Sequence, residues 1–86
     1  MQKRALLEVF IGPGCDACET ARTIFERVGN ARLPGLEARL TDLSDPDASK
    51  PASVFAIPTY VLEGKIVSLG NPEVGRLLDR IAEVLG

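Results

Sequence analysis

Cys15 and Cys18 are the only two thiols in this 86-residue chain, and two residues separate them. Sulfurs at this spacing can bond to each other, and an exposed thiolate beside a second thiol can exchange disulfides with a partner. The same pair could instead bind a soft metal ion or form a structural disulfide. The surrounding sequence has to distinguish these three kinds of chemistry.

The cysteine pair lies between a predicted strand and a predicted helix. Ala5–Ile11 is almost continuously apolar, residues 12–14 (Gly-Pro-Gly) break the strand, and apolar residues recur at helical spacing over residues 17–28. We expect Cys15 near the N-cap of this helix and Cys18 one turn further in. Backbone N–H groups without helical partners and the helix dipole would both favour a thiolate there.

Asp16 adds a negative charge between the two cysteines. At about 7 Å and an effective dielectric of about 40–80, its carboxylate disfavours a Cys15 thiolate by roughly 0.6–1.2 kcal/mol. The helix N-terminus acts in the opposite direction by a comparable amount. We therefore expect a Cys15 pKa nearer neutral than strongly acidic, and a dithiol that donates electrons as a reductase does. A purely structural interpretation of Asp16, as an acid in the first helical turn, stays open.

The residues that could complete a metal site are scarce. Zinc normally takes four ligands, whereas the chain has no histidine and no third cysteine. A Cu(I) carrier stays open, because soft thiolates suit Cu(I). Such carriers follow the order β-α-β-β-α-β and end in a strand, whereas this chain is predicted to end in an amphipathic helix.

Three further strands are predicted after the first helix, which the Gly29-Asn30 pair ends. Apolar and polar residues alternate over residues 36–43, as in a strand with one wetter face. Thr59–Leu62 and Lys65–Leu69 have the composition of a hairpin joined at Glu63-Gly64. Between these strands, residues 44–51 permit only a short or broken helix.

The last element is predicted to be an amphipathic helix that Asn71 caps, with Pro72 in its first turn and Glu73 beside its dipole. Its apolar face contains Val74, Leu77, Leu78, Ile81, Val84 and Leu85. The predicted order is β-α-β-(α)-β-β-α, an α/β fold with a mixed four-stranded sheet flanked by helices. Three phenylalanines are expected in the core: Phe10, Phe25 and Phe55.

A proline opens the third predicted strand, in Ile57-Pro58-Thr59. Proline cannot donate to a strand ladder and is unexpected in a central strand without a special reason. With Cys-x-x-Cys after the first core strand and Ile-Pro-Thr opening the third, the chain resembles the thioredoxin superfamily over roughly residues 5–85. In size it is similar to small thioredoxins and glutaredoxin-like proteins.

The resemblance implies a thioredoxin-like fold and a thiol–disulfide oxidoreductase that reduces protein disulfides by dithiol exchange. Cys15 would be the exposed nucleophile and Cys18 the resolving thiol, with a redox-active disulfide between them and no bound cofactor or metal. The family's proline is cis and lies against this disulfide. The residues implied to contact substrate are Gly14, Asp16, Ala17, Ile57, Pro58 and Thr59.

The sequence departs from the thioredoxin pattern at several positions. The tryptophan and the Gly-Pro pair of Trp-Cys-Gly-Pro-Cys are missing, and Val9 stands where many thioredoxins carry a buried aspartate. The basic residue and the Gly-Gly…Asp pair with which glutaredoxins bind glutathione have no clear counterpart. The resemblance therefore leaves glutathione binding open.

Length and charge limit the other functions. The chain fits one domain, residues 1–86, and its net charge of −2 gives no basic surface for nucleic acid. No run approaches the ~18 apolar residues of a membrane span, and the start of the chain lacks the cleavage site of a signal peptide. We expect a monomer in the cytoplasm, where a purely structural disulfide would be unusual.

The partners implied are a disulfide-containing protein and an upstream reductase, of the thioredoxin-reductase type or from the glutathione system. A redox-inactive interaction domain of the same fold is a further alternative.

Overall fold

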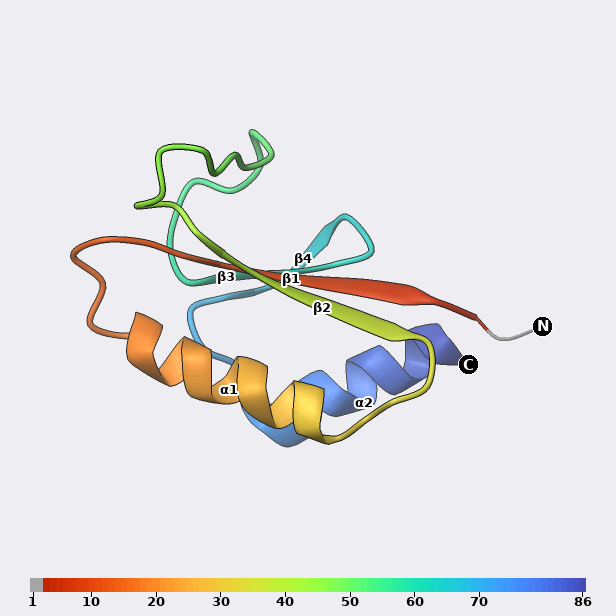
Figure 1. Cartoon of the computed structure of the whole chain (residues 1–86). Helices are drawn as coiled ribbons and strands as arrows, with labels where there is room; N and C mark the ends of the chain where they lie inside the picture. The colour runs from red at the N-terminus through yellow and green to blue at the C-terminus, as the bar shows by residue number, and fades with distance from the viewer. Residues whose placement is uncertain (1–2) are drawn as a thin grey trace.

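The computed structural model describes residues 3–86, which form one sheet and two helices (Figure 1). The elements in chain order are β1 (Ala5–Ile11), α1 (Cys18–Asn30), β2 (Leu36–Asp42), β3 (Thr59–Leu62), β4 (Lys65–Leu69) and α2 (Val74–Leu85). This is the predicted α/β order, without the optional helix between β2 and β3.

The sheet has the strand order β2-β1-β3-β4. Strand β1 pairs in parallel with β2 and antiparallel with β3, and β3 pairs antiparallel with β4. The predicted mixed four-stranded sheet is therefore confirmed. Ile11 lies opposite Asp42, and Phe10 lies opposite Thr59. The last residues of β1 consequently meet the end of β2 and the start of β3.

Both helices cover the same face of the sheet, the lower face in Figure 1. Because side chains alternate along a strand, every second residue of β1 points toward the helices. The main core contains buried residues of β1 (Ala5, Leu7, Val9, Ile11), α1 (Cys18, Ala21, Ile24, Val28), β3 (Tyr60, Leu62) and α2 (Leu77, Ile81). Within residues 3–86, neither helix is long and apolar enough to cross a membrane.

The opposite face of the sheet is covered near one end by residues 43–58, which lie above it in Figure 1. Phe10 and Val61 point to this face and form a second buried cluster with Val54, against which Leu43 packs. Residues 43–58 thus cover one end of this face with far fewer apolar side chains than the helices supply to the other face.

Residues 43–58 form turns and irregular structure instead of the short helix that the sequence allowed. The carboxylates of Asp42 and Asp45 each accept a hydrogen bond from the backbone N–H two residues later, which favours turns. Pro46 and Pro51 have no N–H to donate to a helix. Local side-chain hydrogen bonds and the two prolines therefore prevent a continuous helix.

Phe55 is 75% exposed, so the expectation that all three phenylalanines lie in the core is wrong. Phe10 is buried and Phe25 packs partly buried against the main core. In an irregular segment neighbouring side chains can point in opposite directions, and here Val54 turns inward while Phe55 turns outward.

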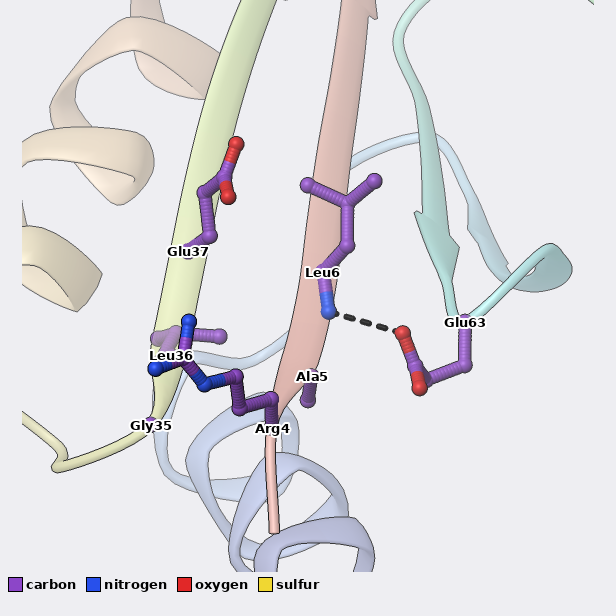
Figure 2. Close-up of a pocket in the computed structure, with 7 residues that line it drawn as sticks. All are labelled: Arg4, Ala5, Leu6, Gly35, Leu36, Glu37 and Glu63. Carbon is purple, nitrogen blue, oxygen red and sulfur yellow. Dashed lines mark hydrogen bonds between the residues drawn. The ribbon is translucent and has the colours of Figure 1, made fainter.

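A surface hollow lies at the other end of β1 (Figure 2). The Glu63 carboxylate accepts a hydrogen bond of 2.8 Å from the Leu6 N–H, and the Glu63 N–H donates to the Leu6 C=O at 2.9 Å. Glu63 therefore extends the β1–β3 ladder at this end of the sheet. The hollow lies about 20 Å from the end of β1 that leads to the cysteines, the length of a seven-residue strand.

Val54→Ala should destabilise the protein, whereas Phe55→Ala should not. Val54 is completely buried, so its truncation removes apolar contacts and leaves a cavity, at a cost of about 1–3 kcal/mol in the free energy of unfolding. Truncation of the exposed Phe55 should change that free energy by less than about 0.5 kcal/mol. Urea unfolding of both variants measures the difference, and equal losses would contradict the second cluster.

Candidate active site

Cys15 and Cys18 form a disulfide in the segment directly after β1. Their Cα atoms are 5.4 Å apart, a normal separation for bonded cysteines. Cys18 is 6% exposed and belongs to the main core, whereas Cys15 is partly exposed and packs against that core from outside. The Cys15 residue is therefore the more accessible of the two.

Helix α1 begins later than the sequence predicted. Ala17 is the N-cap and Cys18 is the first helical residue, so Cys18 is not one turn into the helix. Ala17 has no side-chain acceptor, and the Cys18 N–H donates instead to the Cys15 C=O at 3.2 Å. Residues 15–18, called the cysteine turn below, thus form a tight turn that leads into the helix.

Glycines shape the loop between β1 and the cysteine turn. Gly14 has a φ of +65°, a left-handed conformation that favours glycine, and it leads directly into Cys15. A Cβ on Gly12 would lie 2.9 Å from the Cδ1 atom of Ile57. The loop that precedes the cysteines therefore touches the residue that precedes Pro58.

The Ile57–Pro58 peptide bond is cis. Pro58 is buried and its C=O accepts a hydrogen bond of 2.8 Å from the Gly70 N–H. Thr59 is also buried, and its hydroxyl donates to the Ala56 C=O at 2.6 Å. Within residues 3–86, neither the N–H nor the C=O of Ile57 has a backbone partner. Ile57 thus presents a partly exposed side chain and a free backbone, while the Thr59 side chain faces inward.

A chain of hydrogen bonds, which the sequence did not predict, joins the sheet to the cysteine turn. The Tyr60 hydroxyl donates to Asn71 Oδ1 at 2.8 Å, and Asn71 Nδ2 donates to the Ala17 C=O at 2.9 Å. Tyr60 is completely buried, and burial raises the pKa of its hydroxyl to about 12. Asn71, at the centre of these hydrogen bonds, connects the Ala17 C=O, which lies between the two cysteines, to the Tyr60 hydroxyl in β3.

The sequence suggested that Asn71 caps α2, but the N-cap residue is Glu73. The Glu73 carboxylate accepts hydrogen bonds of 3.0 Å from the N–H groups of Gly75 and Arg76, and these bonds lower its pKa. Glu73 directly precedes the helix in an extended conformation, so it reaches those groups and leaves Asn71 free. A buried tyrosine hydroxyl requires a hydrogen-bond partner. This requirement is the one sequence signal that could have indicated a role for Asn71.

One charged side chain near the cysteine turn is held in an ion pair. Arg22, one helical turn after Cys18, forms an ion pair of 3.1 Å with Asp42 at the end of β2. Hydrogen bonds from Ser44 lower the pKa of Asp42, and Arg22 adds to this effect. Val9, at the position of the buried aspartate of many thioredoxins, is completely buried, and no acidic side chain of residues 3–86 is buried.

Metal-ligating side chains do not gather in groups of three or more histidines, cysteines, aspartates or glutamates in the part of the chain that the structure describes. Among residues 3–86, the soft sulfur ligands for a metal ion are the two cysteine sulfurs, which are already joined in the disulfide.

The predicted site residues gather at the end of the sheet where β1 stops and β3 starts. Gly14, Asp16 and Ala17 are exposed around the partly exposed Cys15. The Ile57 side chain lies against the same loop at Gly12, whereas Pro58 and Thr59 are buried. A sheet of this order with a Cys-x-x-Cys disulfide after β1 and a proline at the start of β3 defines a thioredoxin-like domain.

Comparison with known proteins agrees with this class. A family model described as a thioredoxin domain matches residues 6–82. The chain is 26% identical over 80 residues to a protein named thioredoxin from Methanocaldococcus jannaschii, and the match covers 92% of this chain and 94% of that protein. The chain therefore belongs to the thioredoxin domain family, a family of thiol–disulfide oxidoreductases, as the sequence resemblance predicted.

Tyr60 should ionise only in strongly alkaline solution. The chain has one tyrosine and no tryptophan, so phenolate absorbance reports on Tyr60 alone. Because burial raises its pKa to about 12, the folded state holds the phenolic proton more firmly than the unfolded state. The resulting stabilisation is complete below the ordinary pKa of about 10 and is lost as the pH rises through about 12.

An absorbance titration of the folded and urea-unfolded protein checks this prediction. We expect the folded midpoint well above the unfolded one, and Tyr60→Phe should remove the loss of stability in this alkaline range. Equal midpoints in the two states would show that the hydroxyl is not buried.

Proposed function

We propose that this protein reduces protein disulfides by dithiol exchange, with Cys15 as the nucleophile and Cys18 as the resolving thiol. The observation that carries the proposal is the unequal accessibility of the two cysteines, since Cys15 is partly exposed and Cys18 is 6% exposed. The nucleophile has to reach a substrate disulfide, whereas the resolving thiol has to reach only the nucleophile.

The reaction begins with the dithiol form. The Cys15 thiolate attacks one sulfur of the substrate disulfide, that disulfide breaks, and its other sulfur leaves as a thiolate. Cys18, after losing its proton, attacks Cys15 Sγ and expels the second substrate sulfur. The substrate has then gained two electrons and, from solvent, two protons, while Cys15 and Cys18 have become the disulfide that the structure contains. An external dithiol restores the reduced form by the reverse exchange.

We assign substrate binding to the exposed groups around Cys15. The free N–H and C=O of Ile57 can pair with an extended substrate strand, as an unpaired strand edge does. Gly14, Asp16 and Ala17 form the exposed rim on the other side of Cys15. Pro58 and Thr59, which the resemblance implied as substrate contacts, are buried, so we assign them to holding the neighbouring Ile57 in position, with the Thr59 hydroxyl bonded to the Ala56 C=O.

The partners proposed are a disulfide-containing protein substrate and an upstream dithiol donor, either a reductase of the thioredoxin-reductase type or the glutathione system. We propose that residues 1–86 act as one cytoplasmic, monomeric domain without a bound cofactor. The relative from Methanocaldococcus jannaschii is matched over 94% of its length, which supports an assignment at the level of the whole domain.

A Cu(I) carrier, the alternative that the sequence left open, has no structural observation in its favour. Three strands, β2, β3 and β4, separate α1 from α2, whereas the order β-α-β-β-α-β of such carriers has two strands between its helices. Cys18, one of the two ligands it would use, is buried in the main core.

Insulin reduction with dithiothreitol as the electron donor tests the proposed reaction. The wild-type protein should accelerate reduction, and both Cys15→Ser and Cys18→Ser should lose this activity, because each reaction cycle needs two thiols. Cys18→Ser should also accumulate a mixed disulfide between Cys15 and the substrate, which mass spectrometry detects.

Cys15→Ser is the matched control, because its remaining thiol is buried and should trap little substrate. Tight Cu(I) binding by a wild-type protein that does not reduce insulin would contradict the proposal and favour the carrier. Full activity of Cys18→Ser would contradict the role of Cys18.

Gly12→Ala should impair substrate binding more than stability. The new Cβ would lie 2.9 Å from Ile57 Cδ1, the flexible end of a side chain, so Ile57 would have to shift. We expect the KM for insulin to rise roughly fivefold, the equivalent of about 1 kcal/mol, with a nearly unchanged rate toward a small disulfide.

Gly29→Ala is the control for this variant, because no atom lies within 4 Å of a Cβ at this helical position. Alanine there should leave KM unchanged and stabilise α1 slightly. An unchanged KM in Gly12→Ala would remove Ile57 from the binding surface.

A further inference from the structure

We infer that Asn71 is a positioning residue, which holds the cysteine turn in the arrangement required for the Cys15–Cys18 disulfide to close. The inference rests on the dithiol exchange proposed above. It concerns the second half of that reaction, in which Cys18 attacks Cys15.

The hydrogen-bond partners of Asn71 determine the orientation of its amide. The Ala17 carbonyl can only accept, so the amide nitrogen of Asn71 has to face it, at 2.9 Å. The amide oxygen then faces the Tyr60 hydroxyl, which donates to it at 2.8 Å. A rotation of the amide by half a turn would place two acceptors, Asn71 Oδ1 and the Ala17 C=O, against each other, so the Ala17 carbonyl fixes one orientation and the Tyr60 hydroxyl donates to the oxygen that remains.

The sheet and α2 hold the two ends of the segment that carries Asn71. Tyr60 lies completely buried in β3 and supplies a fixed donor. The Gly70 N–H is bonded to the Pro58 C=O at 2.8 Å, and Glu73 caps α2 two residues after Asn71. Asn71 itself is exposed, so its contribution comes from these hydrogen bonds and not from filling space in the core.

Ala17 is the residue through which this arrangement acts on the cysteines. Its carbonyl also accepts the Ala21 N–H at 3.1 Å, so it is bonded to the helix on one side and to Asn71 on the other. Ala17 directly precedes Cys18 and is separated from Cys15 by one residue. Fixing this carbonyl therefore fixes the path of the backbone between the two sulfurs.

The bond from Asn71 matters most when the disulfide is open. In the closed form the covalent bond between Cys15 and Cys18 already restricts the cysteine turn. In the dithiol and in the mixed disulfide that restriction is gone, and the bonds to Ala17 keep Cys18 close to Cys15. Such preorganisation raises the effective concentration of one thiol at the other.

The affected step is the attack of the Cys18 thiolate on Cys15 Sγ. The Cys15–Cys18 bond forms, the bond from Cys15 to the substrate sulfur breaks, and the substrate leaves as a thiolate. Without the bond from Asn71, the open form has more conformations to lose on closing. Closure should then be slower, and the equilibrium should shift toward the dithiol.

The test uses Asn71→Ala in the full chain and two measurements. In dithiothreitol redox buffers, the equilibrium constant for disulfide formation should fall about fivefold, which corresponds to a potential raised by about 20 mV. With a small aromatic disulfide whose thiolate is coloured, the first thiolate released reports attack by Cys15 and the second reports closure by Cys18. The second phase should slow about fivefold while the first stays unchanged.

Two further variants keep this test decisive. Tyr60→Phe retains the buried ring and removes only the hydroxyl that orients Asn71, so it should produce a smaller change in the same direction. Glu73→Ala weakens the cap of α2, which holds the far end of the segment that carries Asn71, without removing a bond to Ala17. It should therefore change both measurements less than Asn71→Ala does.

The inference is overturned if Asn71→Ala keeps the wild-type equilibrium constant and closure rate, or if Glu73→Ala changes them as much as Asn71→Ala does. If Asn71→Ala does not fold, a wild-type closure rate in Tyr60→Phe would also overturn it. Failure of the wild type to reduce insulin would instead contradict the proposed function, because the equilibrium with dithiothreitol is measured without a protein substrate.

Discussion

The antiparallel pairing of β1 with β3 is the interaction on which the position of every site residue depends. It sets Phe10 opposite Thr59, so the loop that leaves β1 and the residues that enter β3 lie at the same end of the sheet. Gly12 and Ile57, about 45 positions apart in the chain, therefore lie next to each other at the loop that leads to Cys15. The parallel pairing with β2 brings Asp42 to the same end, where it binds Arg22 of the helix that carries Cys18.

The unequal packing of the two faces of the sheet explains why the cysteines differ in accessibility. Both helices lie on one face, and α1 has to begin close to the end of β1 in order to cover it (Figure 1). Cys18, the first residue of α1, is drawn into the main core by the same face that buries Ala21 and Ile24. Cys15 belongs to the turn before the helix and keeps part of its surface free. The difference in accessibility thus follows from where the helix starts.

Much of this fold could be predicted from the sequence, because its strands carry local signals. The apolar run of β1 and the hairpin of β3 and β4 have the predicted bounds, and the cysteine spacing and the Ile-Pro-Thr motif indicated the family. Features that depend on contacts distant in sequence could not be predicted. Glu73 and Asn71 are both plausible caps for α2, and only the location of the Tyr60 hydroxyl distinguishes their roles. Likewise, no local pattern shows which of Val54 and Phe55 turns inward.

The irregular covering of the second sheet face has a consequence for how the molecule can open. Residues 43–56 are anchored by a small cluster around Phe10 and Val54, separate from the large core that unites both helices with β1 and against which Ile57 packs. Regions with few apolar contacts detach at lower free energy than the global transition requires. This segment can therefore lift away as a sub-global unit while the helices and the disulfide stay in place. Ile57, which follows this segment and packs against the main core, would keep its place while the second face of the sheet opens.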